Sequence, residues 1–178
     1  MKNVIISETS LKRQEKLRLG LSFKEKLEVA KKLSELKADI IELGPLSNDK
    51  AEEIFIKTVA NCVKKTKLAV YGGDTVESVE KTFALLSAAK SGRIIIEVPV
   101  SPVYMEYAES KKPKAVLENL ITLTEKASSL CKDVEVSLLD ATRAEPSFLY
   151  QAIKAAITSG AKTVTLTDLA GTDRKSVV

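Results

Sequence analysis

Two small groups of charged residues are the best candidates for chemistry. Lys12 and Arg13 stand side by side near the N-terminus, and Glu42 interrupts an otherwise apolar run. An isolated carboxylate is costly to bury, so we expect Glu42 to pair with Lys12 or Arg13. Asp140 and Arg143 are three residues apart, which predicts an ion pair or a cap at the end of a strand. Cationic groups of this kind can hold a carboxylate or an enolate.

The complete absence of histidine excludes several classes of site. It rules out Ser-His-Asp and Cys-His catalysis, a histidine general base and a histidine metal ligand. Cys62 and Cys131 form no CxxC motif and do not have the spacing of zinc ligands. Each cysteine follows an apolar helical stretch, so we expect both to be small buried core residues. The sequence therefore predicts no histidine- or cysteine-based metal site, and no cofactor is expected.

The net charge of +4 is unevenly distributed: residues 1–37 carry an excess of five positive charges. No aromatic residues are interleaved with this basic segment, so we expect no nucleic-acid partner. No apolar run reaches the roughly 18 residues that a membrane span requires, and the N-terminus lacks a signal peptide. A cytoplasmic protein without a membrane partner is therefore expected. Hydrophobic residues make up 44% of the chain, as in a folded globular protein.

Short β-branched runs alternate with longer helical patterns along the chain. Most runs are continuously apolar, as in parallel strands covered on both faces. The segments between them are long enough for crossover helices, and the first begins with a capping box of Ser22 and Glu25. Strands are expected at Asn3–Glu8, Asp39–Leu43, Lys67–Tyr71, Arg93–Val98, Val134–Leu138 and Thr163–Thr167.

This order predicts an α/β fold of about six parallel βα units in one domain, residues 1–178. Two architectures fit the pattern, a doubly wound open sheet and a barrel of the TIM type. A complete barrel has eight units in roughly 250 residues, so the periodicity alone favours the open sheet. Neither a GxGxxG motif nor a P-loop motif is present, and no nucleotide-phosphate cradle is predicted.

Several segments, kept in order, resemble one family. IISETSLKRQE and LSFKEKLEVAKKLSELKADIIELG are similar to the start of the isopropylmalate synthase and homocitrate synthase family. That family belongs to the DRE-TIM metallolyases, which also include the HMG-CoA lyases. SPVYMEYAESKKPKAVLENL resembles its segment after strand four, and DVEVSLLDATRAEPSFLYQAIKAAITSGAKTVTLTD resembles its strands five and six. The resemblance spans nearly the whole chain and implies a partial TIM barrel rather than an open sheet.

The resemblance also implies a chemistry: a metal-assisted Claisen condensation of acetyl-CoA with a 2-oxo acid, or the retro-aldol reverse. Where the family's LRDG motif has its catalytic arginine and metal-binding aspartate, this chain has Lys12 and Arg13. A guanidinium only donates hydrogen bonds and cannot ligate a cation. Two further polar positions of the family are Leu139 and Leu169 here, and the family's HxH motif has no counterpart. The retained positions are Glu42, Asp140, Thr142, Arg143, Asp168 and Gly171.

Three functions remain open. The first is a catalytically degenerate relative that acts as a regulatory or structural subunit, because six units leave two unpaired sheet edges. Its partner would be a second copy or a chain that completes the barrel. The second is a metal-independent lyase, aldolase or condensing enzyme, with Lys12 and Glu42 as candidate catalytic residues and a Schiff base on Lys12 as one variant. The third is a non-catalytic binder of a small anionic metabolite, a 2-oxo acid or an acyl-CoA, held by Lys12, Arg13, Glu42, Asp140 and Arg143.

Overall fold

The computed structural model of the chain describes residues 4–12, 20–44, 50–108 and 110–171. Within these ranges, six strands form one parallel sheet in which every strand lies beside its neighbour in the sequence. This order excludes the doubly wound sheet, in which the strand order reverses at a switch point. The strands are β1 (Ser7–Glu8), β2 (Ile40–Leu43), β3 (Lys67–Tyr71), β4 (Gly92–Pro99), β5 (Val134–Leu139) and β6 (Thr163–Leu166).

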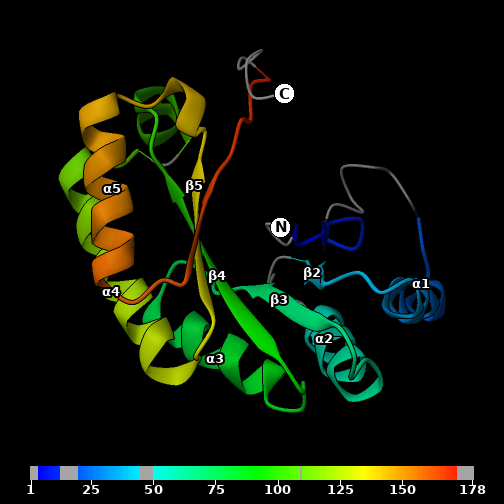
Figure 1. Cartoon of the computed structure of the whole chain (residues 1–178). Helices are drawn as coiled ribbons and strands as arrows, with labels where there is room; N and C mark the ends of the chain where they lie inside the picture. The colour runs from blue at the N-terminus through cyan, green and yellow to red at the C-terminus, as the bar shows by residue number, and fades with distance from the viewer. Residues whose placement is uncertain (1–3, 13–19, 45–49, 109, 172–178) are drawn as a thin grey trace.

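In the described part of the chain, five α-helices connect these strands and cover the outer face of the sheet. Figure 1 shows the sheet curled into part of a barrel, with α3, α4 and α5 outside β4 and β5 and a concave face on the other side. The predicted partial TIM barrel is confirmed. The helices are α1 (Phe23–Glu35), α2 (Lys50–Cys62), α3 (Val76–Leu86), α4 (Pro113–Leu130) and α5 (Pro146–Thr158), with a π-helical turn at Tyr104–Ala108 and a 3₁₀ turn at Ala141–Arg143.

Local sequence signals explain how several of these helices begin. The predicted capping box at α1 is present: Ser22 Oγ accepts from the Glu25 amide, and the Glu25 carboxylate accepts from the Ser22 amide. Thr75 and Ser78 form a second box at α3. At α5, Pro146 occupies the first turn, where the missing N–H costs no intrahelical bond. These signals set where α1, α3 and α5 begin.

The strand β1 is shorter than the predicted Asn3–Glu8. Asn3 lies outside the described residues, and only Ser7 and Glu8 are in register with β2. Ahead of them, the Ile6 carbonyl accepts from the Ile40 amide at 3.1 Å. A strand at the edge of a sheet has one neighbour, so pairing begins only where β2 itself begins. Three large apolar side chains remain exposed there: Val4, Ile5 and Ile6.

The main core lies between the outer face of the sheet and the helices. Alternate strand residues point into it, so the apolar runs predicted as strands supply one wall of the core. Phe55 and Ile56 of α2 and Leu120 of α4 supply the other wall. The strand residues of this core with no exposed surface are Ile41, Leu43, Leu68, Val70, Ile94, Ile96, Val134, Val136 and Leu138.

The expectation that both cysteines are buried is wrong. Cys131 is half-buried, and its Sγ lies 3.4 Å and 3.3 Å from the carbonyl oxygens of Gly92 and Asp133. Cys62 is exposed. It is the last residue of α2. Among the described residues, no helix combines the length and apolar character needed to cross a membrane.

The burial of the strand residues predicts a large cost for truncating one of them. Leu68 has no exposed surface, and its change to alanine should lower the free energy of unfolding by about 2–5 kcal/mol because a cavity remains. Leu36→Ala is the matched control, since Leu36 is 78% exposed and its loss should change stability by less than about 0.5 kcal/mol. Urea denaturation measures both, and equal effects would contradict this assignment of the core.

Candidate functional site

The concave face of the sheet carries charged residues held in a network. Near the N-terminal ends of the strands, Asp133 accepts hydrogen bonds from Lys67 and from Arg93, whose Nε lies 2.9 Å away. Arg93 also donates to Glu135 at 2.7 Å, and Glu135 accepts from Thr165 at 2.7 Å. Burial would raise the pKa of Asp133, but the hydrogen bonds from Lys67 and Arg93 outweigh it, so this pKa is lowered. The network joins β3, β4, β5 and β6 from inside.

A second cluster occupies the C-terminal end of the same face. The Lys12 ammonium lies 2.7 Å from Glu97 Oε1 and 3.2 Å from Glu42 Oε2. Ser7 Oγ donates to the other oxygen of Glu42 at 2.8 Å. Lys12 follows β1, Glu42 lies in β2 and Glu97 in β4, so one ammonium connects three strands. The predicted ion pair between Lys12 and Glu42 is confirmed, and Arg13 lies outside the described residues.

The two carboxylates fix the protonation state of Lys12. Burial alone would lower the pKa of Lys12, but Glu97 and then Glu42 outweigh this effect, so the pKa is raised above its ordinary value of 10.5. A raised pKa keeps the amine protonated at neutral pH. A protonated amine has no lone pair for attack on a carbonyl carbon, so this environment opposes nucleophilic use of Lys12.

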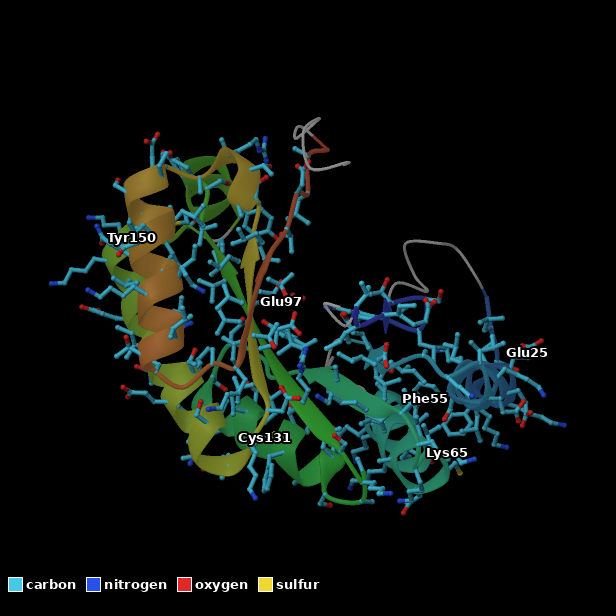
Figure 2. The ribbon with its side chains drawn as sticks, in the orientation of Figure 1. Glu25, Phe55, Lys65, Glu97, Cys131 and Tyr150 are labelled. Carbon is cyan, nitrogen blue, oxygen red and sulfur yellow. The ribbon has the colours of Figure 1, made fainter. Side chains whose placement is uncertain are left out.

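A cavity of about 420 Å³ opens beside this cluster. Its lining includes Leu139 and Leu169, the two apolar residues that replace polar positions of the resembling family. Among its lining residues one positive charge, on Lys12, faces three carboxylates. In Figure 2 the labelled Glu97 lies in the space between the β4–β5 side of the sheet and the β1–β2 side. The lining residues are Thr9, Lys12, Glu42, Ile95, Glu97, Tyr104, Glu135, Ser137, Leu139, Thr165, Thr167 and Leu169.

Asp140 and Arg143 lie apart from this cavity and form the predicted ion pair. Asp140 is fully buried, adopts a left-handed conformation with φ 60°, and accepts from Arg143 Nη2 at 2.7 Å. Ser101 donates to the same carboxylate. The hydrogen bond from Arg143 outweighs burial, and with help from Ser101 it lowers the pKa of Asp140. The hydrogen bond from Ser101 to Asp140 therefore connects the segment after β4 to the end of β5.

The other retained positions also make local contacts. Thr142 Oγ1 donates to Asp168 Oδ1 at 2.9 Å, which connects the 3₁₀ turn to the segment after β6. Gly171 has φ 63°, the backbone conformation expected of a turn glycine. The structure thus separates the sequence candidates into two groups: Lys12 and Glu42 at the cavity, and Asp140 and Arg143 outside it. A catalytic or substrate-binding role for either group stays a prediction.

The described residues do not fit the divalent metal that the resemblance implies. Glu42 and Glu97 are the acidic side chains nearest to Lys12, and its ammonium already lies within 3.2 Å of both. A cation bound there would have to displace Lys12 and would meet its charge. Within the described ranges no three Asp, Glu, Cys or His side chains come together in a way that could hold a metal.

Glu97 is the residue of this site that the sequence analysis missed. It interrupts the apolar run Ile94–Pro99 in the same way that Glu42 interrupts its own run. The argument that a lone carboxylate in an apolar strand needs a cationic partner applies equally to it. Glu135 carries a similar signal within β5, where it alternates with buried valines.

Comparisons with known proteins agree with the fold and the motifs. The model of the family described as HMGL-like matches residues 3–176. The chain is 33% identical over 171 residues to the 2-isopropylmalate synthase of Caulobacter vibrioides, covering 95% of this chain and 32% of that protein. It is 31% identical over 173 residues to the 2-isopropylmalate synthase of Pyrococcus abyssi, covering 96% of this chain and 35% of that protein. The chain spans about a third of the length of these curated relatives.

Removing the Lys12 ammonium should change how stability depends on pH. Because the pKa of Lys12 is raised by folding, its contribution is complete below pH 10.5 and is lost as the pH rises through the higher folded value. Lys12→Met should lower the free energy of unfolding by about 2 kcal/mol at pH 7, since two carboxylates lose their partner. That deficit should shrink above pH 10.5.

Denaturant midpoints measured from pH 7 to pH 11.5, for the original chain and for Lys12→Met, check this prediction. Lys154→Met is the matched control, because Lys154 is exposed on α5 and makes no ion pair within the described residues. A deficit in Lys12→Met that stays constant over the whole range would contradict the prediction.

Proposed function

Because this chain belongs to the HMGL-like family, we propose that it is a relative of the acyl-CoA-dependent 2-oxo acid condensing enzymes that no longer catalyses condensation by itself. In this proposal it acts as a structural or regulatory subunit. The observation that carries the proposal is the position of Lys12, which is held between Glu42 and Glu97 beside the cavity. An ammonium shared by two carboxylates has little capacity left to stabilise a developing enolate.

Substitutions around the cavity support loss of the family chemistry. Arg13 stands where the metal-binding aspartate of the resembling motif is expected, and a guanidinium cannot bind a metal ion. Leu139 and Leu169 line the cavity and offer no hydrogen bond to a 2-oxo acid carboxylate. These substitutions affect the groups expected to bind the metal, to stabilise the enolate and to bind the substrate. A single change of mechanism would not account for all three.

The other two functions receive less support from the same residues. The Schiff-base variant requires a neutral Lys12, whereas its carboxylate neighbours raise its pKa. Binding of an anionic metabolite beside Lys12 requires an excess of positive charge, whereas Glu42 and Glu97 outnumber it. An anion site in this cavity would therefore have to depend on Arg13.

The edges of the sheet support a role through contacts with another chain. β1 and β6 are the outermost strands, so each leaves one row of backbone groups unpaired by any described strand. Val4, Ile5 and Ile6 are 83%, 64% and 62% exposed at the β1 edge, and Leu166 is 55% exposed at β6. Exposed apolar residues on an open strand edge favour pairing with further strands, which a second copy or a related chain would supply.

Incubation with acetyl-CoA, Mg²⁺ or Mn²⁺ and a panel of 2-oxo acids tests the loss of catalysis. Mass spectrometry should detect no condensation product above a blank without protein, because neither enolate nor metal has its usual partners. The 2-isopropylmalate synthase of Caulobacter vibrioides serves as the positive control. A product that disappears in Lys12→Ala but persists in Lys154→Ala would sink the proposal.

Light scattering tests the role of the edges. The chain alone has a mass of 19.4 kDa, and we expect the measured mass to be at least about twice this value at micromolar concentration, a range in which specific interfaces bind. Ile5→Lys should shift the population towards the monomer, because a charge is placed on the exposed edge. Ile157→Lys on α5 is the control, since Ile157 is similarly exposed at 59%. A stable monomer at every concentration would count against pairing with a second copy.

A further inference from the structure

A pocket lined by lysines lies at the opposite end of the sheet from the Lys12 cluster. Its volume is about 340 Å³, and it sits where α1 and α2 end, just before β2 and β3 begin. Figure 2 shows Lys65 at this end of the molecule, well separated in the view from Glu97. The lining residues are Lys31, Ser34, Glu35, Lys37, Cys62, Val63, Lys64 and Lys65.

The local ion pairs leave an excess of three positive charges at this pocket. Lys31 pairs with Glu28 at 2.9 Å, and Glu35 pairs with Lys32 at 2.8 Å, so these four charges balance. The ammonium of Lys64 keeps its charge, although it donates to the carbonyl oxygens of Ala60 and Ala88. Across the part of the chain that the structure describes, neither Lys37 nor Lys65 makes an ion pair.

The negative ends of the helix dipoles explain why some, but not all, of these lysines lie at this pocket. Cations near a helix C-terminus are favourable, and Lys64 uses this interaction directly through its two carbonyl partners. Lys37 and Lys65 come from two different connections, after α1 and after α2, and both line the same hollow. Two unpaired ammonium groups around one pocket repel each other, and an anion between them would offset this repulsion.

We propose that this pocket binds a small anion carrying a diphosphate group. Lysine ammonium groups act as compact point charges that donate hydrogen bonds to phosphate oxygens from many directions, whereas carboxylate recognition favours the planar fork of arginine. A diphosphate carries several negative charges at neutral pH and so matches an excess of three. The volume is at the lower end of the range for ligand pockets, which suits inorganic pyrophosphate or the diphosphate of a nucleotide.

Two features make the site testable apart from any activity. The lysines lie at the N-terminal end of the strands, so changes there leave the Lys12, Glu42 and Glu97 contacts intact. Cys62 lines the pocket and has an exposed thiol, which a neutral alkylating reagent can reach. Its rate of alkylation therefore reports whether the pocket is occupied.

Calorimetric titration of the whole chain with inorganic pyrophosphate, and separately with a nucleoside diphosphate, measures binding. The double variant Lys37→Glu, Lys65→Glu should weaken binding at least about tenfold, because two attractive charges become repulsive. The control pair Lys114→Glu, Lys154→Glu changes the net charge equally on exposed positions away from the pocket and should change affinity less than about twofold. Circular dichroism confirms that each variant is folded.

Alkylation by iodoacetamide in a Cys131→Ser background, where Cys62 is the remaining cysteine of the sequence, locates the anion. Saturating pyrophosphate should slow the reaction several-fold. A thiol rate that does not change on binding, equal weakening in both variant pairs, or no binding of either diphosphate would overturn the proposal. Binding of a single-stranded oligonucleotide that needs Lys37 and Lys65, without binding of pyrophosphate, would overturn it as well. Binding of pyrophosphate alone, or of the nucleoside diphosphate alone, would support the site and show which of the two compounds it recognises.

Discussion

The structure depends on the requirement that charges on the enclosed face of a curled parallel sheet find partners. The helices bury the outer face with apolar residues, but the concave face carries lysine, arginine and carboxylate side chains. Partial burial makes each unpaired charge costly, so the side chains pair across strands rather than along them. Arg93 with Asp133 and Glu135, and Lys12 with Glu42 and Glu97, are the two results. With the bonds of Ser7, Lys67 and Thr165 they connect all six strands.

In the proposed function, the same requirement accounts for the loss of condensation at the cavity beside Lys12. A reactive centre needs a charge that is available to the substrate, and here the ammonium of Lys12 is used by the fold. Its position beside β1, β2 and β4 lets one ammonium group connect three strands near their C-terminal ends. If the proposed function holds, a barrel of this family keeps its architecture while a catalytic position at its C-terminal end becomes a stabilising contact.

The two ends of the described sheet differ in charge. Carboxylates exceed cations around the cavity at the C-terminal end, and lysines exceed carboxylates in the pocket where α1 and α2 finish. In barrels of this kind the C-terminal end carries the reaction and the N-terminal end contributes to stability. An anion site at the N-terminal end would give this chain a binding function that does not depend on the chemistry of its relatives.

The sequence by itself determined the alternation of strands and helices, the capping box at Ser22, and the need of Glu42 for a cationic partner, either Lys12 or Arg13. These follow from local periodicity and from the cost of a lone buried carboxylate. Tertiary structure decided the rest. Strand order distinguished the barrel from the open sheet, and strand curvature brought Glu97 to Lys12 across 85 residues. The tertiary structure also leaves Cys62 exposed and brings together lysines from the connections after α1 and after α2. The sequence at one helix end does not specify which other helix end lies beside it.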